Sequence, residues 1–190
     1  MKLKSKVLII AGSDSSGGAG IQADIKTVTA LGSYATTAVT AVTAQNTKGV
    51  KKIIPIPTEI VQKQIIMILD DIGTNAVKIG MLHNAGIIKI IYKILKKYKS
   101  KNIVLDPVMI SKGGAKLISD NSIKHLKKLL LPLCSLVTPN IPEAEVLTGY
   151  SISTKEDMIK AAKKILNMGS KNVLLKGGHF KNKMIFDILV

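Results

Sequence analysis

Residues 7–20 decide the fold of this chain and read VLIIAGSDSSGGAG. The first four residues are apolar, which is typical of a strand that is buried on both faces of a sheet. Glycines and short polar side chains follow, and glycine lets a backbone turn sharply and lets a ligand approach it closely. The next residues, GIQADIKTVTALG, have apolar side chains at helical spacing. A glycine-rich loop before a helix presents free N–H groups, which suits an anion or a polar ring, although a plain strand-to-helix turn has the same pattern.

Strand-like and helix-like patterns alternate along the rest of the chain, with short connections between them. The strand-like segments are continuous apolar runs, as in parallel sheets that are covered on both faces. The sequence therefore predicts a three-layer α/β/α fold with a mostly parallel sheet, in a single domain over residues 1–190. The expected strands are residues 7–10, 34–46, 76–81, 102–106, 136–140, 172–178 and 185–190, and the expected helices are residues 20–32, 58–72, 84–99, 121–131 and 153–169, with a short helix that begins at residues 142–143.

Local signals indicate where some elements begin and where the chain is irregular. Thr58 is expected to cap a helix. Ser153 and Glu156 have the spacing of a capping box. Residues 47–57 include a glycine and two prolines, which predicts an irregular crossing or lid segment, and residues 111–115 (SKGGA) resemble a flexible loop.

The composition is that of an ordinary globular protein. Of the 190 residues, 46% are hydrophobic and 21% are charged. No apolar run is long enough to span a bilayer, and the basic start has no signal-peptide cleavage site, so we expect a cytoplasmic protein with no membrane partner. Cys134 is the only cysteine, which leaves neither a disulfide framework nor a cysteine-based metal site.

The net charge of +16 raises the question of a nucleic-acid partner. All 28 basic residues are lysine, so there is no arginine for bidentate contacts with bases or phosphates. Aromatic residues make up only 3% of the chain, and there is no tryptophan to stack on bases. We therefore expect no nucleic acid as partner, whereas a small molecule that carries phosphate would benefit from the positive field.

Polar residues follow the expected strands at the points where the strands end. Ligands of open parallel sheets bind outside the carboxyl ends of the strands, so these residues should meet at one edge. Some have a structural alternative, because Asp106 could cap a loop, Glu143 could be a first-turn helix charge, and Gln45 could satisfy a strand end. The residues expected at this edge are the loop 12–20, Gln45, Gly80, Met81, Asp106, Asn140, Glu143, Lys176, Gly177 and Gly178.

Phosphoryl transfer is the chemistry that fits such an edge, since it needs ligands for Mg²⁺ and a cation near the transferring phosphate. Asp106, Asn140 and Glu143 are candidates for the metal, directly or through water. Lys176 precedes a Gly-Gly turn and is a candidate for the phosphates. Gln45 has an amide that can both donate to and accept from a polar heterocycle. The chain has no GxxxxGK[ST] loop and matches GxGxxG poorly, which argues against a P-loop NTPase and a dinucleotide-binding enzyme.

Several stretches of the sequence point together to one family. They are AGSDSSGGAGIQADIKT, TAVTAQNTKGV, KIGML, VLDPVM, LVTPNIPEAEVLTG and VLLKGGH, and they cover nearly the whole chain. In content and order they resemble the hydroxymethylpyrimidine/phosphomethylpyrimidine kinases of thiamine biosynthesis, a family of the ribokinase-like superfamily. The resemblance implies a ribokinase-like fold. It also implies transfer of phosphate from MgATP to 4-amino-5-hydroxymethyl-2-methylpyrimidine and then to its monophosphate.

The resemblance implies roles for particular residues. Gln45 would form hydrogen bonds with the aminopyrimidine, and Lys176 would contact the phosphates. Asp106, Asn140 and Glu143 would organise the ATP phosphates and Mg²⁺, with Asp106 and Glu143 as the residues of the metal site. The rest of the substrate pocket would be lined by Gly12, Ala19, Asp24, Met81 and Val108.

One motif of the family is missing from this sequence. The family has a G-T-G-[CD] motif that forms an anion hole and supplies the residue thought to activate the hydroxymethyl group. No Gly-Thr-Gly occurs here, and Cys134 is in the wrong place to substitute, so no catalytic residue is assigned and we expect a C-terminally truncated kinase. The alternatives are a non-catalytic remnant, a pyrimidine-binding fragment that needs a separately encoded C-terminal piece, and a pyridoxal-type vitamin kinase. Dimers are usual in the family, so the resemblance also allows a homodimer.

Overall fold

The computed structural model describes residues 4–109, 118–178 and 185–190, and the loop expected at residues 111–115 lies outside these ranges. The predicted strands and helices are present in the predicted order, together with one further strand at residues 49–55. The strands are β1 (Lys6–Asp14), β2 (Tyr34–Asn46), β3 (Gly49–Pro55), β4 (Ala76–Ile79), β5 (Ile103–Leu105), β6 (Leu136–Val137), β7 (Leu174–Leu175) and β8 (Ile188–Leu189). The α-helices are α1 (Gly20–Ala30), α2 (Thr58–Met67), α3 (Ala85–Lys97), α4 (Asp120–His125), α5 (Ile141–Thr148) and α6 (Lys155–Leu166).

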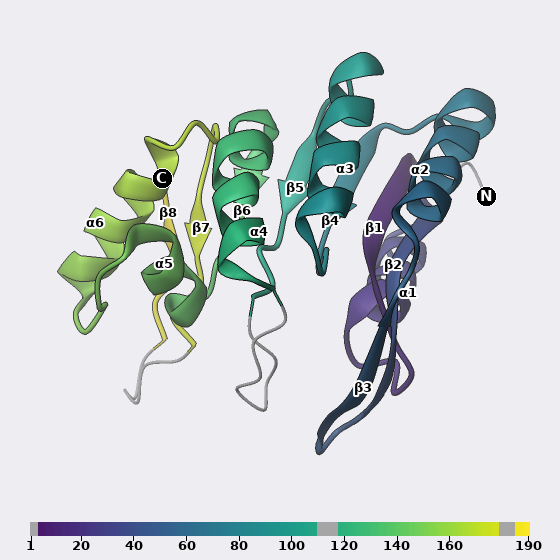
Figure 1. The fold of residues 1–190 in the computed structure, drawn as a ribbon. Helices are drawn as coiled ribbons and strands as arrows, with labels where there is room; N and C mark the ends of the chain where they lie inside the picture. Colours follow the sequence, from purple (N-terminus) through teal and green to yellow (C-terminus); the bar gives the residue numbers. More distant parts are fainter. Residues whose placement is uncertain (1–3, 110–117, 179–184) are drawn as a thin grey trace.

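The central sheet is mostly parallel, as the sequence predicts. Its strand order is β3-β2-β1-β4-β5-β6, and only β3 runs antiparallel to its neighbour. Two parallel bridges, Val137 with Val173 and Asn140 with Lys176, place the β7 segment beside β6. The short strand β8 pairs antiparallel with β7 (Figure 1). The carboxyl ends of the parallel strands therefore meet at one edge, and this arrangement fits the ribokinase-like fold that the resemblance implies.

The two faces of the sheet are covered unequally. On one face, Val77 and Ile79 of β4 are fully buried in a large core together with Ile87, Ile88 and Ile91 of α3. The opposite face has a smaller cluster in which Ile9 and Ala11 of β1 pack with Ile21 of α1.

Further along that face, Lys78 of β4 and Val104 of β5 are only partly buried. The expectation of helices on both faces is confirmed, but within the described residues α1 is the helix that forms this second core.

Residues 47–57 contradict the expectation of an irregular segment. Most of them form β3, which pairs antiparallel with β2 from Gly49 to Pro55. The turn is closed by Asn46, whose Oδ1 accepts hydrogen bonds from the backbone N–H groups of Lys48 and Gly49. Prolines argue against a central strand, but β3 is an edge strand, where a missing N–H donor is tolerated.

Two of the predicted helix caps are wrong by one residue. The cap of α2 is Pro57, and Thr58 is the first helical residue. The capping box of α6 is made by Thr154 and Asp157, whose side chains each accept a hydrogen bond from the other residue's backbone N–H. The run STKED offers Thr-x-x-Asp directly after the expected Ser-x-x-Glu, and the spacing rule alone does not choose between them. None of the helices in the described ranges combines the length and the apolar character that a bilayer crossing needs.

Candidate active site

The loop after β1 is organised by Asp14, a buried carboxylate. Its oxygens accept hydrogen bonds from the backbone N–H and the hydroxyl of Ser16, both at 2.8 Å for Oδ1, and from the N–H of Ala19, at 2.8 Å for Oδ2. Burial alone would raise the pKa of Asp14, but these hydrogen bonds outweigh burial and hold the pKa below its usual value. Gly20 then adopts a left-handed φ of +57°, and a Cβ at this position would overlap the carbonyl oxygen of Gly12.

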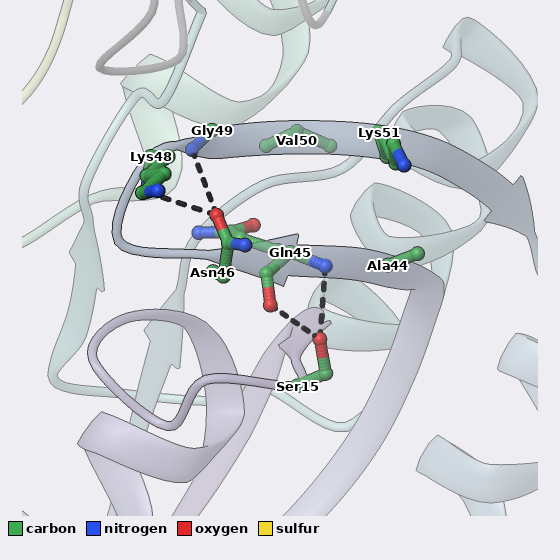
Figure 2. A pocket seen from close by; sticks show the side chains of 8 residues that line it. All are labelled: Ser15, Ala44, Gln45, Asn46, Lys48, Gly49, Val50 and Lys51. Atoms are coloured by element: carbon green, nitrogen blue, oxygen red, sulfur yellow. Dashed lines mark hydrogen bonds between the residues drawn. The ribbon is translucent and has the colours of Figure 1, made fainter.

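The same loop is joined to the end of β2 by Ser15 and Gln45. The hydroxyl of Ser15 donates to the carbonyl oxygen of Gln45 at 2.7 Å and accepts from its N–H at 2.9 Å (Figure 2). The hydroxyl of Thr43 lies 2.8 Å from the carbonyl oxygen of Ser13 and 3.2 Å from Oε1 of Gln45. The backbone of Gln45 is thus held by the loop after β1, and its side-chain amide contacts Thr43 of its own strand. Next to Gln45, the β2–β3 hairpin lines an open hollow to which Lys48 and Lys51 also contribute (Figure 2).

A cavity of about 520 Å³ lies at the carboxyl edge of the sheet. It brings together all six residues that were expected to line the substrate pocket, and they come from β1, the β1–α1 loop, α1, and the ends of β2, β4 and β5. Its size is within the usual range for a small-molecule site. These six residues are Gly12, Ala19, Asp24, Gln45, Met81 and Val108, and Asp106 borders the same cavity.

The cavity also contains an ion pair that the sequence analysis did not identify. Nζ of Lys78 lies 2.6 Å from Oδ2 of Asp24, and the two side chains are 26% and 21% exposed. Lys78 belongs to β4, between Val77 and Ile79, which are completely buried on the other face of the sheet. A lysine inside an otherwise apolar strand needs a partner for its charge, so its presence in the sequence could have indicated an ion pair here.

A second group of polar side chains lies at the ends of β5, β6 and β7. Oδ1 of Asp106 accepts hydrogen bonds from Nζ of Lys176 at 2.9 Å and from the hydroxyl of Thr138 at 3.1 Å. The backbone N–H of Lys176 donates to the carbonyl oxygen of Pro139, which keeps β7 in register with the segment after β6. Asp106 therefore belongs both to this group and to the cavity, whereas Lys176, Asn140 and Glu143 do not line the cavity.

Asn140 and Glu143 form the capping box of α5. Oδ1 of Asn140 accepts from the N–H of Glu143, and Oε2 of Glu143 accepts from the N–H of Asn140, both at 2.9 Å. Burial raises the pKa of Glu143 to about 7. The hydrogen bond from Asn140 and the ammonium of Lys176 oppose this shift, while the negative charge of Asp106 adds to it. Glu143 therefore stabilises the first turn of α5, which is the structural alternative considered for it. A role in phosphate chemistry would be additional to this helix capping.

The oxygen donors of this group suit a hard cation such as Mg²⁺. Both side-chain contacts of Asp106 use Oδ1, so Oδ2 has no hydrogen-bond partner within residues 4–109, 118–178 and 185–190. In those ranges, no group of three or more His, Cys, Asp and Glu side chains is arranged to hold a metal ion. Mg²⁺ is commonly held by one or two carboxylates together with water and substrate phosphates, so Asp106 with Glu143 fits that pattern.

Two polar residues of the edge, Lys78 and Thr138, were missed by sequence reasoning, and Asp14 was included only as part of the loop 12–20. Lys78 could have been noticed as a charge in an apolar strand, and Asp14 as the carboxylate among the serines of the loop. Thr138 had no signal, because threonine is common in strands. The thiol of Cys134 lies in the core and does not line the cavity, and burial raises its pKa to about 12.

Comparison with known proteins places this chain in a family. The chain is 51% identical over 186 residues to the thiamine biosynthesis bifunctional protein ThiED of Geobacter sulfurreducens. It is 49% identical over 174 residues to the hydroxymethylpyrimidine/phosphomethylpyrimidine kinase of Bacillus subtilis. These matches use 98% and 92% of this chain but span only 38% and 64% of the two relatives.

Solved structures agree with these relatives. The phosphomethylpyrimidine kinase of Clostridium difficile superposes with a TM-score of 0.90 at 50% identity, over 100% of this chain and 80% of that one. The pyridoxal kinase of Staphylococcus aureus, in complex with pyridoxal, superposes with a TM-score of 0.90 at 37% identity, over 100% and 69%. The family model described as phosphomethylpyrimidine kinase matches residues 14–190, and the chain belongs to the phosphomethylpyrimidine kinase family.

Proposed function

We propose that this chain is a kinase that transfers phosphate from ATP to 4-amino-5-hydroxymethyl-2-methylpyrimidine and to its monophosphate, in the synthesis of thiamine. The observation that carries the proposal is the cavity at the carboxyl edge of the sheet. Six residues chosen from the sequence for a pyrimidine pocket line that single cavity, together with Asp106. Such a convergence of residues from four strand ends is what a built ligand site requires.

The proposal assigns the two sides of the site different tasks. Gln45 reads the aminopyrimidine, because its amide can accept from the ring amino group and donate to a ring nitrogen. Lys176 and Asn140 contact the ATP phosphates. Asp106 and Glu143 would hold Mg²⁺, which supplies charge neutralisation for the phosphates when it is bound. Asp106 is the residue that joins the two sides, since it borders the cavity and pairs with Lys176.

Direct binding and turnover test the proposal. The purified chain is titrated with the hydroxymethylpyrimidine by calorimetry, and is then incubated with MgATP while the phosphorylated product is followed by mass. Gln45→Ala should weaken binding by about tenfold or more, since it removes hydrogen bonds to the ring. Gln62→Ala, on the exposed side of α2, should leave binding unchanged.

The outcomes distinguish the proposed kinase from its alternatives. If neither the pyrimidine nor its monophosphate binds, the proposal is wrong. If the pyrimidine binds and Gln45→Ala weakens binding, but no product forms, the chain is a pyrimidine-binding protein without turnover. Restored turnover on addition of a separate polypeptide from the family's C-terminal region would then favour a site made by two chains.

A pyridoxal kinase is the second candidate function. It is supported by the superposition with the pyridoxal kinase of Staphylococcus aureus in complex with pyridoxal. Pyridoxal and the hydroxymethylpyrimidine are both small heteroaromatic alcohols, so the same cavity is a candidate site for either compound. We expect pyridoxal to bind more weakly than the pyrimidine, because it lacks the amino group that Gln45 would read. Tighter binding and faster turnover of pyridoxal would reverse the order of the two candidates.

A further inference from the structure

The charged side chain of Lys78 lies in surroundings that would suit an apolar residue. On its face of the sheet, Lys78 is in register with Ile9 of β1 and with Val104 of β5. Ile9 is fully buried, and the side chain of Lys78 is only 26% exposed. Removing an ammonium group from water is unfavourable unless it is paired, and a well-packed apolar side chain here would often be no less stable. Stability alone therefore does not explain a lysine at this position.

The space around Lys78 is shaped to keep its ammonium at the cavity. A Cβ at Gly80 would lie 3.2 Å from Nζ of Lys78 and 3.0 Å from the Cβ of Ala11. The side chain of Lys78 thus extends along β4 toward the carboxyl edge of the sheet, into space that Gly80 leaves open. Asp24 on α1 meets it there at 2.6 Å. Gly80, Asp24 and Lys78 all line the cavity.

The other charged groups of the cavity are already committed or lie at its rim. Asp14 is satisfied by its own loop, and Asp106 is paired with Lys176. Lys48 belongs to the open hairpin. Nζ of Lys78 donates to Asp24, and within the described ranges no second acceptor contacts it. An ammonium group has three N–H donors, so Lys78 can bridge Asp24 and an acceptor on a ligand.

We propose that Lys78 is a specificity-determining residue of the cavity and that its ammonium donates to the exocyclic oxygen of the bound pyrimidine. This inference rests on the proposed function. In the strand order β2-β1-β4-β5, Gln45 lies on β2, β4 is between β1 and β5, and β5 leads to Asp106. A ring held by Gln45 would direct its substituent toward β4 and β5. That substituent is a neutral hydroxymethyl group in one substrate and an anionic phosphate ester in the other, and charge-assisted hydrogen bonds are the stronger ones. Lys78 should therefore contribute more to the affinity for the monophosphate than to the affinity for the alcohol.

Titration of the full chain with each compound, by calorimetry without ATP, tests this inference. Lys78→Met should weaken binding of the monophosphate by about tenfold to a hundredfold and binding of the alcohol by only a few-fold. Lys78→Arg keeps the charge and should restore part of the preference. The double variant Asp24→Asn, Lys78→Met removes both charges, so that no unpaired carboxylate remains, and it should show the same selective loss.

The matched control is Lys63→Met on α2. Nζ of Lys63 is also 2.6 Å from a carboxylate oxygen, that of Glu59, but both side chains are exposed and lie outside the cavity. This variant should bind both compounds as the unmodified chain does. An equal loss for the two compounds in Lys78→Met and in the double variant would make the ion pair merely structural and would overturn the inference, as would no loss for either. If the unmodified chain binds neither compound, the proposed function itself fails, and that result is distinct from the others.

Discussion

Asp106 and Lys176 are 70 residues apart in the sequence, and their side chains meet at 2.9 Å at the carboxyl edge of the sheet. The contact joins the end of β5, which borders the cavity, to the end of β7, which pairs with β8. Asp106 is 27% exposed and Lys176 is 40% exposed, so the pair is open to solvent and to a ligand. An ion pair of this exposure adds little to stability. Its position matters more to the proposed function, in which Lys176 contacts the ATP phosphates and Asp106 borders the cavity.

Replacing Lys176 should separate nucleotide binding from pyrimidine binding. Lys176→Met removes the cation assigned to the phosphates, and we expect the affinity for a non-hydrolysable ATP analogue to fall by about tenfold to a hundredfold. The affinity for the pyrimidine alcohol should stay within about twofold, because Lys176 does not line the cavity. Calorimetric titrations of each ligand measure both effects. Lys171→Met changes an exposed lysine before β7 and serves as the control. Equal losses for the two ligands would contradict the assignment.

Asp14 should support both the loop and the cavity wall. Asp14→Asn leaves one acceptor oxygen for N–H and O–H donors that now use two, and at neutral pH it should lower the free energy of unfolding by about 1–3 kcal/mol. The folded pKa of Asp14 lies below its ordinary value, so its contribution is present above that value and is lost as the pH falls through the folded pKa. Urea unfolding at neutral and at acid pH should show the difference shrink. Asp71→Asn, at an exposed position, is the control. If the difference in free energy of unfolding between the unmodified chain and Asp14→Asn persists at acid pH, the effect comes from the altered side-chain geometry and not from the lost charge.

The sequence was sufficient to predict the edge of the sheet but not the pairing of charges along it. Parallel strands put their carboxyl ends together, so Gln45, Met81 and Asp106 were expected at one edge before their contacts were known. The partner of Lys78 could not be predicted, because Asp24 and Lys78 meet only when α1 packs on the sheet. In that packing Ile21 contacts the cluster of Ile9 and Ala11, a long-range contact that no local pattern records.

Local rules failed where several residues could play the same part. Thr154 caps α6 although Ser153 has an equally suitable hydroxyl, and the choice depends on where the preceding turn leaves the chain. Residues 49–55 form a strand because they lie at the edge of the sheet beside β2, and propensity alone does not include that neighbour.

Glu143 should make stability depend on pH in the opposite direction from Asp14. Its folded pKa of about 7 exceeds the ordinary value of 4.5, so the folded state binds the proton more tightly. Its contribution is fully present below about pH 4.5 and is lost as the pH rises through about 7, by an amount on the order of 3 kcal/mol. Glu143→Gln keeps the shape and cannot ionise, so its free energy of unfolding should lack this decline. Urea unfolding of both proteins across this range isolates the residue, because the other carboxylates are common to both. A constant difference across the range would show that Glu143 does not titrate there.

Two glycines with the same backbone handedness should respond very differently to alanine. Gly20 has a φ of +57° and Gly149 has a φ of +81°, so a side chain is strained at either position by about 1 kcal/mol. At Gly149 nothing lies within 4 Å of the added Cβ, whereas at Gly20 it would overlap the carbonyl oxygen of Gly12 and lie 3.1 Å from the N–H nitrogen of Asp14.

We therefore expect Gly149→Ala to lower the free energy of unfolding by about 1 kcal/mol and to spare pyrimidine binding. Gly20→Ala should lower it by more than about 2 kcal/mol and weaken pyrimidine binding, because the loop and β1 must separate to make room. Urea unfolding and calorimetric titration of both variants measure the two effects. Similar values for the two would mean that the loop after β1 gives way easily, and that close packing of Gly20 on Gly12 does not shape the wall of the cavity.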